Sequence, residues 1–349
     1  MNDTNKKDTI LNFFDKTSVF SSSDIAAKID GGVSLVTIKR YLLELFKENM
    51  LERLGAGRSV QYRLTKKGLF GRNINLGAYL SLSPDARLND TNFNFEVFDK
   101  PYVALFSNEE ISKLEEATYN YRKNAEDSEP EAHNKELLRF IIEFSWKTSQ
   151  IEGNTYDLLS TERLLTYGEK ASGHTEFEAQ MIINQKKAVE FVLENIELWN
   201  APKLSSLEML HSFVADKLGI KKNLRRSMVG ITGTNYKPLG SESQIRDALE
   251  LLFGYIGSAE NIYEKALLAV LGVSYIQPFI DGNKRTSRLL GNAILLANNY
   301  APLSYRSVSD RLYKEACLIF YEQNSIESFK KIFVEQYIFA ANTYNIARK

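Results

Sequence analysis

The stretch "YIQPFIDGNKRTSRLL", from Tyr275 to Leu290, determines how the rest of the chain is interpreted. Apolar, helix-like sequence lies on both sides of it, and Pro278 cannot continue the first helix without a free-energy penalty. We therefore expect that helix to end at Gln277 and the next one to begin near Lys284. Helical periodicity is widespread elsewhere and strand signals are sparse, so the predicted fold class is mainly α.

The tight loop between these two helices has the chemistry of an anion site. Gly282 lets the backbone turn and approach a ligand closely. The N-terminus of the following helix offers unpaired N–H groups and a positive dipole potential. Lys284, Arg285 and Arg288 add cationic side chains, and Asp281 is placed to hold a Mg²⁺ ion that bridges phosphates. The sequence therefore predicts a phosphate-binding loop.

The whole string "PFIDGNKRTSR" resembles the core motif of the Fic/Doc family, His-(Pro/x)-Phe-x-(Asp/Glu)-Gly-Asn-(Gly/Lys)-Arg-x-x-Arg. The resemblance extends from about Ser107 to the C-terminus. It fails at one motif position, because Gln277 stands where the family has its histidine. The matching residues are Pro278, Phe279, Asp281, Gly282, Asn283, Lys284, Arg285 and Arg288.

A second stretch, "TSQIEGN", is similar to the inhibitory motif of the same family, (Ser/Thr)-x-x-x-Glu-(Gly/Asn). The matching residues are Thr148, Glu152 and Gly153. The resemblance implies a salt bridge from Glu152 to Arg288 in the space that a γ-phosphate needs. This is physically reasonable, because a carboxylate and a phosphate compete for the same guanidinium.

The resemblance also implies a reaction, the transfer of AMP from ATP to a protein hydroxyl. It implies that the segment 228–240 is a β-hairpin flap that docks the target by edge pairing, and we expect a strand over Met228–Thr232. The resemblance implies that Asp281 is a Mg²⁺ ligand and that Asn283 contacts the α-phosphate. It implies that the Gly282–Lys284 backbone forms an anion hole and that Phe279 anchors the loop in the core. It also implies that Arg285 and Arg288 hold the outer phosphates and that Tyr313 contacts the adenosine.

Gln277 cannot perform the proton transfer assigned to the family's histidine, because an amide does not titrate near neutral pH. Loss of a positioned base typically costs about 10²–10⁴ in rate. We therefore expect a retained nucleotide site with slow or absent transfer. Glu152 is an alternative base that could activate water to remove AMP. The histidines His133, His174 and His211 are interpreted as capping, surface or packing residues, although the sequence leaves their spatial position open.

The N-terminal sequence predicts a separate module. We expect a small winged helix-turn-helix at 1–70, a linker and packing strap at 71–106, and the catalytic-type domain with its inhibitory helix at 107–349. The residues of the third helix that are expected to point inward are Leu35, Ile38, Leu42, Leu45 and Phe46. A module for protein contact or dimerisation is the alternative to DNA binding, and a homodimer is left open. The DNA-contact candidates are Thr37, Lys39 and Arg40 on the third helix and Arg58 and Arg63 on the wing.

Composition limits the remaining function classes. The 44 basic and 44 acidic residues balance, so any nucleic-acid or membrane attraction must come from a local patch. The basic run "KKNLRRS", Lys221 to Ser227, is interpreted as a solvated loop, with guidance of target or nucleotide as the alternative. The polar start and the absence of an 18-residue apolar run predict a cytoplasmic protein without membrane association. The functional expectation is a self-inhibited AMP transferase weakened by Gln277; the alternative is a nucleotide-responsive DNA-binding regulator with a degenerate core.

Overall fold

The computed structural model describes residues 3–15, 17–29, 33–87, 91–126 and 129–348. The internal contacts divide the chain into two compact units, and each is described by itself. The first unit comprises Met1–Asn92, Ile231–Tyr236 and Glu315–Lys330, and the second comprises Phe93–Gly230, Lys237–Lys314 and Lys331–Lys349. The fold is mainly helical, as predicted. The predicted domain limits remain a prediction.

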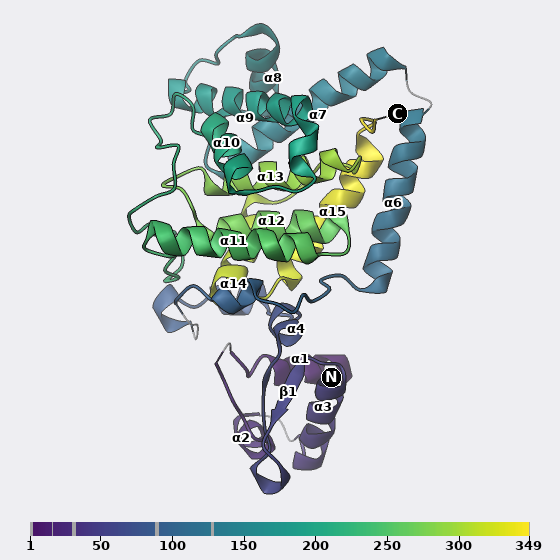
Figure 1. The fold of residues 1–349 in the computed structure, drawn as a ribbon, viewed down its shortest axis with the longest axis vertical. Coiled ribbons are helices and arrows are strands. Elements are labelled where there is room, and N and C mark those ends of the chain that lie inside the picture. The colour runs from purple at the N-terminus through teal and green to yellow at the C-terminus, as the bar shows by residue number, and fades with distance from the viewer. Residues whose placement is uncertain (1–2, 16, 30–32, 88–90, 127–128, 349) are drawn as a thin grey trace. The chain divides into compact units, whose positions relative to one another are not determined.

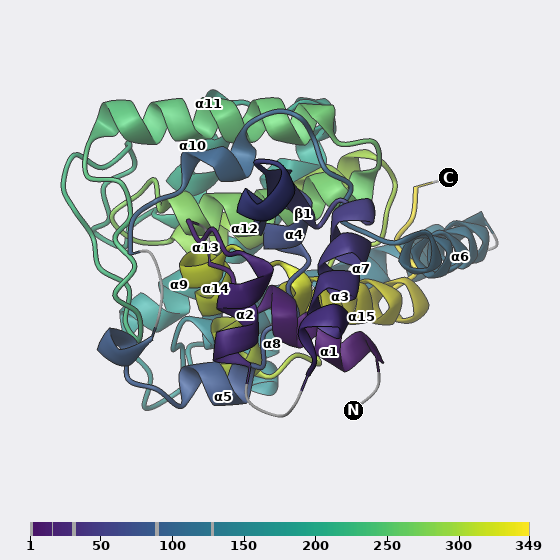
Figure 2. The same cartoon turned by 90° about the horizontal axis from the view of Figure 1, so that it is seen from below.

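The first unit begins with helices and a hairpin in the predicted order. Ser21 caps α2 and Ser34 caps α3 through their side-chain oxygens, which accept from backbone N–H groups of the first turn. The helix α3 packs against α1, α2 and β1 (Figure 2). The elements are α1 (Asp3–Leu11), α2 (Ser22–Lys28), α3 (Leu35–Lys47), β1 (Leu51–Leu54), β2 (Gln61–Leu64), α4 (Lys66–Phe70) and α5 (Leu76–Leu80), with 3₁₀ turns at Gly57–Ser59 and Pro84–Ala86.

The buried face of α3 differs in part from the prediction. Ile38, Leu42 and Leu45 are buried as expected, and Tyr41 joins them. Leu35 and Phe46 were expected inside, but they are 40% and 41% exposed. The reason is that Tyr41 belongs to the buried face of α3. The centre of that face therefore lies further around the helix from Leu35 and Phe46 than was expected. The outward face of α3 therefore carries apolar as well as basic side chains.

The strands β1 and β2 pair antiparallel, with Leu51 opposite Leu64 and Leu54 opposite Gln61. They lie on either side of the predicted turn. No strand was found over 228–240 within the described residues, so the expected strand and flap hairpin are wrong for this segment. Pro238 lacks a backbone N–H to donate. In the first unit, the carbonyl of Gly233 accepts a hydrogen bond from Arg87 Nη1 at 2.9 Å instead of a ladder bond.

The second unit is built around a central helix pair, α12 (Ile262–Ile276) and α13 (Asn283–Ala297). In Figure 1 these helices lie next to each other, with α11 packed on α12 and α10 on α13. The other elements are η3 (Phe95–Phe98), α6 (Asn108–Glu126), α7 (Pro130–Ile151), α8 (Leu158–Tyr167), α9 (Glu176–Glu194), η4 (Ile196–Trp199), α10 (Leu204–Val214), α11 (Glu242–Ser258), α14 (Asp310–Gln323) and α15 (Glu327–Thr343). The last two contribute residues to both units.

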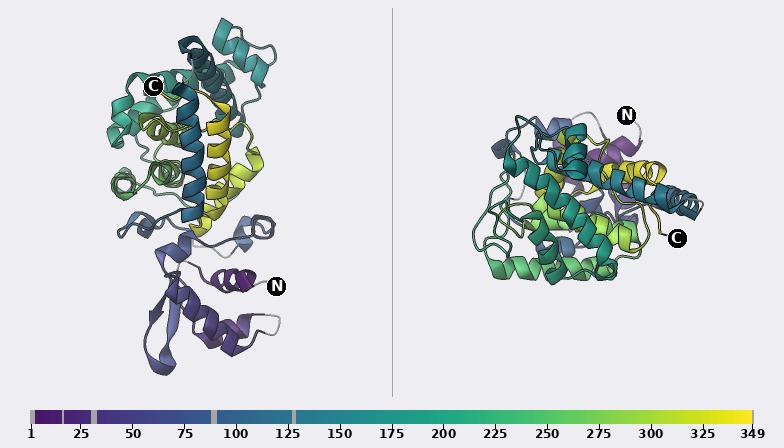
Figure 3. Two further views of the ribbon diagram at one scale, coloured as in Figure 1. Left: turned by 90° about the vertical axis from the view of Figure 1, so that its right-hand side faces the viewer. Right: turned by 90° about the horizontal axis from the view of Figure 1, so that it is seen from above.

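Buried polar contacts fix the helices around this pair. The helices α6 and α15 run side by side (Figure 3), and Thr118 Oγ1 lies 2.6 Å from the hydroxyl of Tyr337. The same Thr118 oxygen lies 2.6 Å from the hydroxyl of Tyr263 on α12. These contacts join α6 and α15 to the central pair. In the part of the chain that the structure describes, no helix has both the length and the apolar character needed to cross a bilayer.

Candidate functional site

The loop between α12 and α13 begins as predicted, with Gln277 directly after the last residue of α12. Gln277 adopts a left-handed conformation, with φ 52° and ψ 59°. Its side-chain Nε2 donates to the carbonyl of Ser274 at 2.7 Å, and its Oε1 accepts from Asn283 Nδ2 at 2.9 Å. The amide is 8% exposed. The side chain that replaces the expected base therefore closes the loop on itself.

Asn283 completes this closure. Its Oδ1 accepts from the backbone N–H of Phe279 at 2.8 Å, and its Nδ2 donates to the carbonyl of Phe279 at 2.8 Å. Phe279 is fully buried, which confirms the expectation that it anchors the loop in the core. Because the Asn283 amide forms its hydrogen bonds within the loop, the observed role of Asn283 is to fix the shape of the loop. Its contact with an α-phosphate stays a prediction.

Buried cations line the start of α13. Arg285 is 2% exposed and donates from Nη2 to Asp281 Oδ2 at 3.2 Å. Its Nε and Nη1 are buried and have no hydrogen-bond partner among the described residues. Burial lowers the pKa of Arg285, and the nearby Asp281 carboxylate opposes that effect. A buried guanidinium with two unpaired donor nitrogens has the chemistry to bind an anion.

Arg288, one turn further along α13, is fully buried and already has partners. Its Nε donates to Thr148 Oγ1 at 2.7 Å, and its Nη2 donates to the carbonyl of Thr148 and to Glu152 Oε1, both at 2.8 Å. The guanidinium carbon lies 5.1 Å from the ring centroid of Tyr313. Burial acts to lower the pKa of Arg288, but Tyr313 and Glu152 outweigh it and raise the pKa. The guanidinium stays charged.

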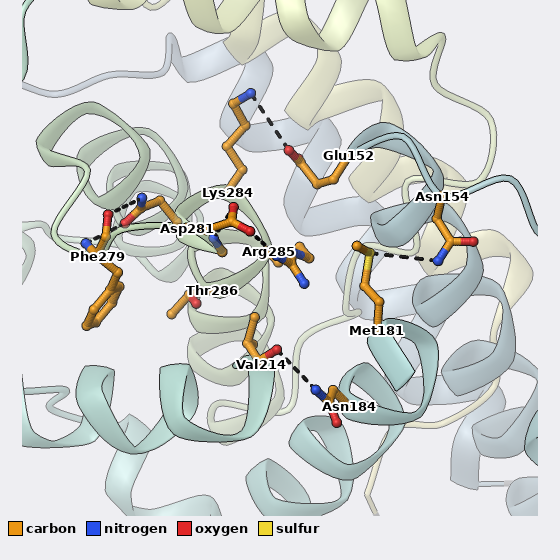
Figure 4. Close-up of polar contacts among 12 residues, drawn as sticks. Glu152, Asn154, Met181, Asn184, Val214, Phe279, Asp281, Lys284, Arg285 and Thr286 are labelled. Atoms are coloured by element: carbon orange, nitrogen blue, oxygen red, sulfur yellow. Dashed lines mark hydrogen bonds and ion pairs between the residues drawn. The ribbon is translucent and has the colours of Figure 1, made fainter. Parts of the chain in front are cut away.

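Glu152 reaches this site from the C-terminal end of α7, which stops as predicted before Gly153. Gly153 has φ 98°, a conformation that glycine adopts without strain. The predicted ion pair between Glu152 and Arg288 is present, and Lys284 Nζ lies 3.8 Å from Glu152 Oε2 (Figure 4). Burial acts to raise the pKa of Glu152, but Arg288 and Lys284 outweigh it and lower the pKa. The carboxylate is therefore ionised at neutral pH.

Asp281 of the loop lies beside Arg285 (Figure 4). Its Oδ1 accepts from the backbone N–H of Gly282 at 2.6 Å, and its side chain is 59% exposed. The described residues contain no cluster of three or more His, Cys, Asp or Glu side chains suited to a metal ion. A magnesium ion here would need phosphate oxygens and water as its other ligands, which is how Mg²⁺ is commonly held at nucleotide sites. The exposed carboxylate of Asp281 is compatible with that arrangement.

His211 lies against the loop, a position that the sequence left open. Its ring stacks on Phe279 with centroids 3.6 Å apart, and Nδ1 lies 3.2 Å from Thr286 Oγ1. Nε2 lies 3.3 Å from the carbonyl of Lys221, which can only accept, so Nε2 carries the proton. A side chain at Gly282 would meet this ring at 3.3 Å. Both ring nitrogens are engaged, so His211 supports the loop and does not replace the missing base.

This position of His211 predicts a pH dependence of stability. Burial lowers the pKa of His211 to about 4, whereas an unfolded histidine titrates near 6.5. As the pH falls below 6.5, the unfolded chain therefore takes up a proton that the folded chain does not. The free energy of unfolding accordingly decreases as the pH is lowered. We expect this histidine to cost about 2 kcal/mol of unfolding free energy between pH 7 and pH 5. Urea unfolding at both pH values measures it, with His211→Gln as the comparison. An identical pH dependence in both proteins would refute it.

Arg225 was missed as a loop residue. Its Nε donates to the carbonyl of Gln277 at 2.6 Å and its Nη2 to that of Ile276 at 3.4 Å, while its backbone N–H donates to the carbonyl of Pro278 at 3.0 Å. The side chain is 2% exposed. The only sequence signal was the basic run around it, which gives no indication of a partner some fifty residues away. Arg225 holds the C-terminal end of α12 and the start of the loop.

The remaining predicted site residues are Tyr313 and the DNA-contact candidates of the first unit. Tyr313 is fully buried beneath Arg288, and its contact with an adenosine stays a prediction. In the first unit Lys39, Arg40 and Arg58 are exposed. Thr37 is half-buried, with its hydroxyl 2.9 Å from that of Ser34. Arg63 is exposed and paired with Glu52 across the hairpin.

Comparisons with known proteins agree with this geometry. Residues 201–295 match the model of the Fic/DOC family. The chain is 26% identical over 181 residues to a protein named protein adenylyltransferase fic-1 from Caenorhabditis briggsae, covering 49% of this chain and 36% of that protein. It is 27% identical over 161 residues to protein adenylyltransferase Fic from Drosophila ananassae, covering 45% and 32%. The chain thus spans about a third of the length of these relatives.

Solved structures show the same fold. A Fic-1 fragment from C. elegans superposes with a TM-score of 0.59 at 17% identity, covering 67% of this chain and 71% of that one. A Fic family protein from Desulfovibrio desulfuricans G20 gives 0.56 at 19% identity, covering 70% and 76%. The chain therefore contains a Fic/DOC family domain at residues 201–295, as the motif predicted. That range includes the phosphate-type loop, while α7 with Glu152 lies outside it.

Proposed function

We propose that this chain binds ATP at the loop between α12 and α13 and transfers AMP to a protein hydroxyl. The observation that carries the proposal is Arg285, whose buried Nε and Nη1 have no partner among the described residues. Buried unpaired donors are costly, and phosphate oxygens are the acceptors that best match a guanidinium. The Fic/DOC match and the adenylyltransferase names of the relatives support ATP as the nucleotide.

In the proposed reaction the target hydroxyl oxygen forms a bond to the α-phosphorus, and pyrophosphate leaves as the bond to the bridging oxygen breaks. Arg285 and Arg288 would hold the outer phosphates. The backbone N–H groups of Gly282–Lys284 would stabilise charge on the α-phosphate at the helix N-terminus. The hydroxyl proton has no side-chain base at Gln277, so it passes to solvent in a slow step.

A magnesium ion would be held by Asp281 together with phosphate oxygens. When bound, it would neutralise phosphate charge and orient the phosphate chain for displacement. The target segment is proposed to dock at 228–240, which in this structure has no strand.

Glu152 is proposed to inhibit this reaction. Its carboxylate occupies an acceptor position on Arg288 that a phosphate oxygen would otherwise use. Because its pKa is lowered, the carboxylate stays charged throughout the neutral range. Removal of Glu152 should therefore open the outer-phosphate position without altering the loop.

Label transfer tests the proposed reaction. Glu152→Gly is incubated with Mg²⁺, lysate proteins and ATP labelled either at the α- or at the γ-phosphate. We expect α-label on protein, more than with the unchanged chain, and no γ-label. Transfer of γ-label would replace AMP transfer by phosphate transfer. If neither label appears on protein, even when Gln277→His is added to Glu152→Gly, the proposal that this chain is a transferase is refuted.

A second candidate function is a nucleotide-responsive DNA-binding regulator. The observation that favours it is the exposure of Lys39 and Arg40 on α3 and of Arg53 and Arg58 on the hairpin. A helix followed by a basic hairpin is a common arrangement for contacting a DNA groove and its phosphates. A gel-shift assay across salt concentration, with and without ATP, tests it. Binding that is lost on Arg40→Glu and changes with ATP supports the regulator. Salt-independent or absent binding excludes it.

A further inference from the structure

A basic groove lies beside the loop, on the side of residues 276–280. It has a volume of about 780 Å³ and lies wholly within the second unit. Its lining includes Arg225, which donates to the carbonyls of Ile276 and Gln277, and Ile280, which directly precedes Asp281. The groove thus borders the loop that carries the proposed phosphate site. It is built partly from the basic run 221–227, whose role the sequence left open.

The charge of the groove is strongly one-sided. Five cationic side chains line it, against the carboxylates of Glu208 and Glu242. Glu242 is shared between Arg226 Nε at 2.7 Å and Arg246 Nη2 at 3.2 Å, so a single carboxylate serves two guanidiniums. Lys221 forms no ion pair within the described part of the chain. The groove therefore keeps cationic donors for a further anion.

The lining favours a protein segment over a nucleic acid. None of the lining residues is aromatic, whereas proteins that hold single-stranded nucleic acid stack bases on aromatic rings. Glu208 and Glu242 would repel a continuous phosphate backbone. Ile280 is 42% exposed and offers an apolar contact among the cations. A protein segment whose carboxylates are separated by an apolar residue matches this arrangement of cations around an apolar side chain.

We propose that this groove selects acidic protein segments as the acceptors of the transfer reaction. Carboxylates of the segment bind Arg246, Arg226 and Lys221, and an apolar side chain rests on Ile280. This brings a hydroxyl residue on the same segment to the loop beside Gln277. The inference rests on the proposed function for the reaction, but binding in the groove does not require catalysis. Exposed ion pairs are individually weak, so the interaction depends on several carboxylates and on ionic strength.

Peptide binding to the full chain tests the proposal. The probe is a fluorescein-labelled peptide that contains tyrosine, leucine and several glutamates. It is compared with the same peptide carrying glutamine for glutamate and with a short single-stranded DNA. We expect the acidic peptide alone to bind, with affinity that falls as salt rises. Arg246→Glu and Lys221→Glu should each weaken it about tenfold or more, because they place like charges together. Lys135→Glu, an exposed lysine of α7, is the matched control and should change nothing.

Equal binding of the glutamine peptide, unchanged affinity in both groove variants, or binding of DNA in place of the peptide would overturn the proposal. Circular dichroism establishes that the variants are folded. Calorimetric titration of the same preparations with ATP distinguishes a failure of the groove assignment from a failure of the proposed ATP site. ATP binding without groove-dependent peptide binding refutes the acidic selectivity alone. Groove-dependent peptide binding without ATP binding refutes the proposed function and leaves the groove assignment standing.

Discussion

Replacing Gln277 by histidine in a Glu152→Gly background is expected to raise the rate of AMP transfer about 10²–10⁴-fold, because it restores a titrating base beside the phosphate loop. The position accepts histidine, which tolerates the left-handed conformation that Gln277 adopts at φ 52°. The phosphate-holding residues are untouched. Incorporation of α-label into protein with time measures the rate.

Gln277→Ala in the same background is the matched control. Like Gln277→His, it removes the amide that forms the hydrogen bonds to Ser274 and Asn283. Unlike histidine, alanine supplies no base. The alanine variant should transfer no faster than Glu152→Gly alone. If histidine and glutamine give equal rates, then the missing base does not limit the reaction and the account of Gln277 is incorrect.

In a Glu152→Gln background, Arg288→Met is expected to lower the affinity for ATP about a hundredfold, because a charge-assisted contact to phosphate contributes about 1.5–3 kcal/mol. Made alone, Arg288→Met leaves Glu152 without its closest cation, which lies at 2.8 Å in the unchanged chain, so the stability of the fold should fall. Equilibrium titration with a fluorescent ATP analogue measures the affinity, and urea unfolding measures the stability.

Arg306→Met is the control for this variant. Arg306 Nη1 pairs with Glu143 Oε1 at 2.8 Å, so its loss also breaks an ion pair to α7, but one that does not involve the loop. It should change stability and leave ATP affinity unchanged. ATP affinity that is equally insensitive to Arg288→Met would show that the outer phosphates are not held there.

The sequence predicted the loop and its surroundings because the relevant signals are local. Pro278 stops α12, Gly282 permits the turn and Gly153 ends α7, and each of these acts within a few residues of its own position. The ion pair between Glu152 and Arg288 joins segments far apart in sequence, and only the resemblance of two motifs to one family indicated it. Spacing alone would not have found it.

Packing decided what the sequence could not. Arg225 and His211 support the loop through backbone carbonyls and a stacked ring, and such partners leave no pattern in a sequence. Leu35 and Phe46 fit a helical stripe, yet the burial of Tyr41 shifts that stripe and leaves them exposed. The segment 228–240 has strand-like residues, yet the described residues form no strand there, so its propensity was overridden by context.

The most direct test of the central claim is a calorimetric titration of ATP, with Mg²⁺, into the unchanged chain and into Glu152→Gln. This substitution keeps the size of the side chain and removes the charge that Arg288 and Lys284 neutralise. Glu131→Gln, an exposed residue in the first turn of α7, is the control. We expect Glu152→Gln to bind ATP at least about tenfold more tightly than the unchanged chain or the control. Equal affinity in all three proteins, or no binding in any, would contradict a phosphate site held closed by Glu152.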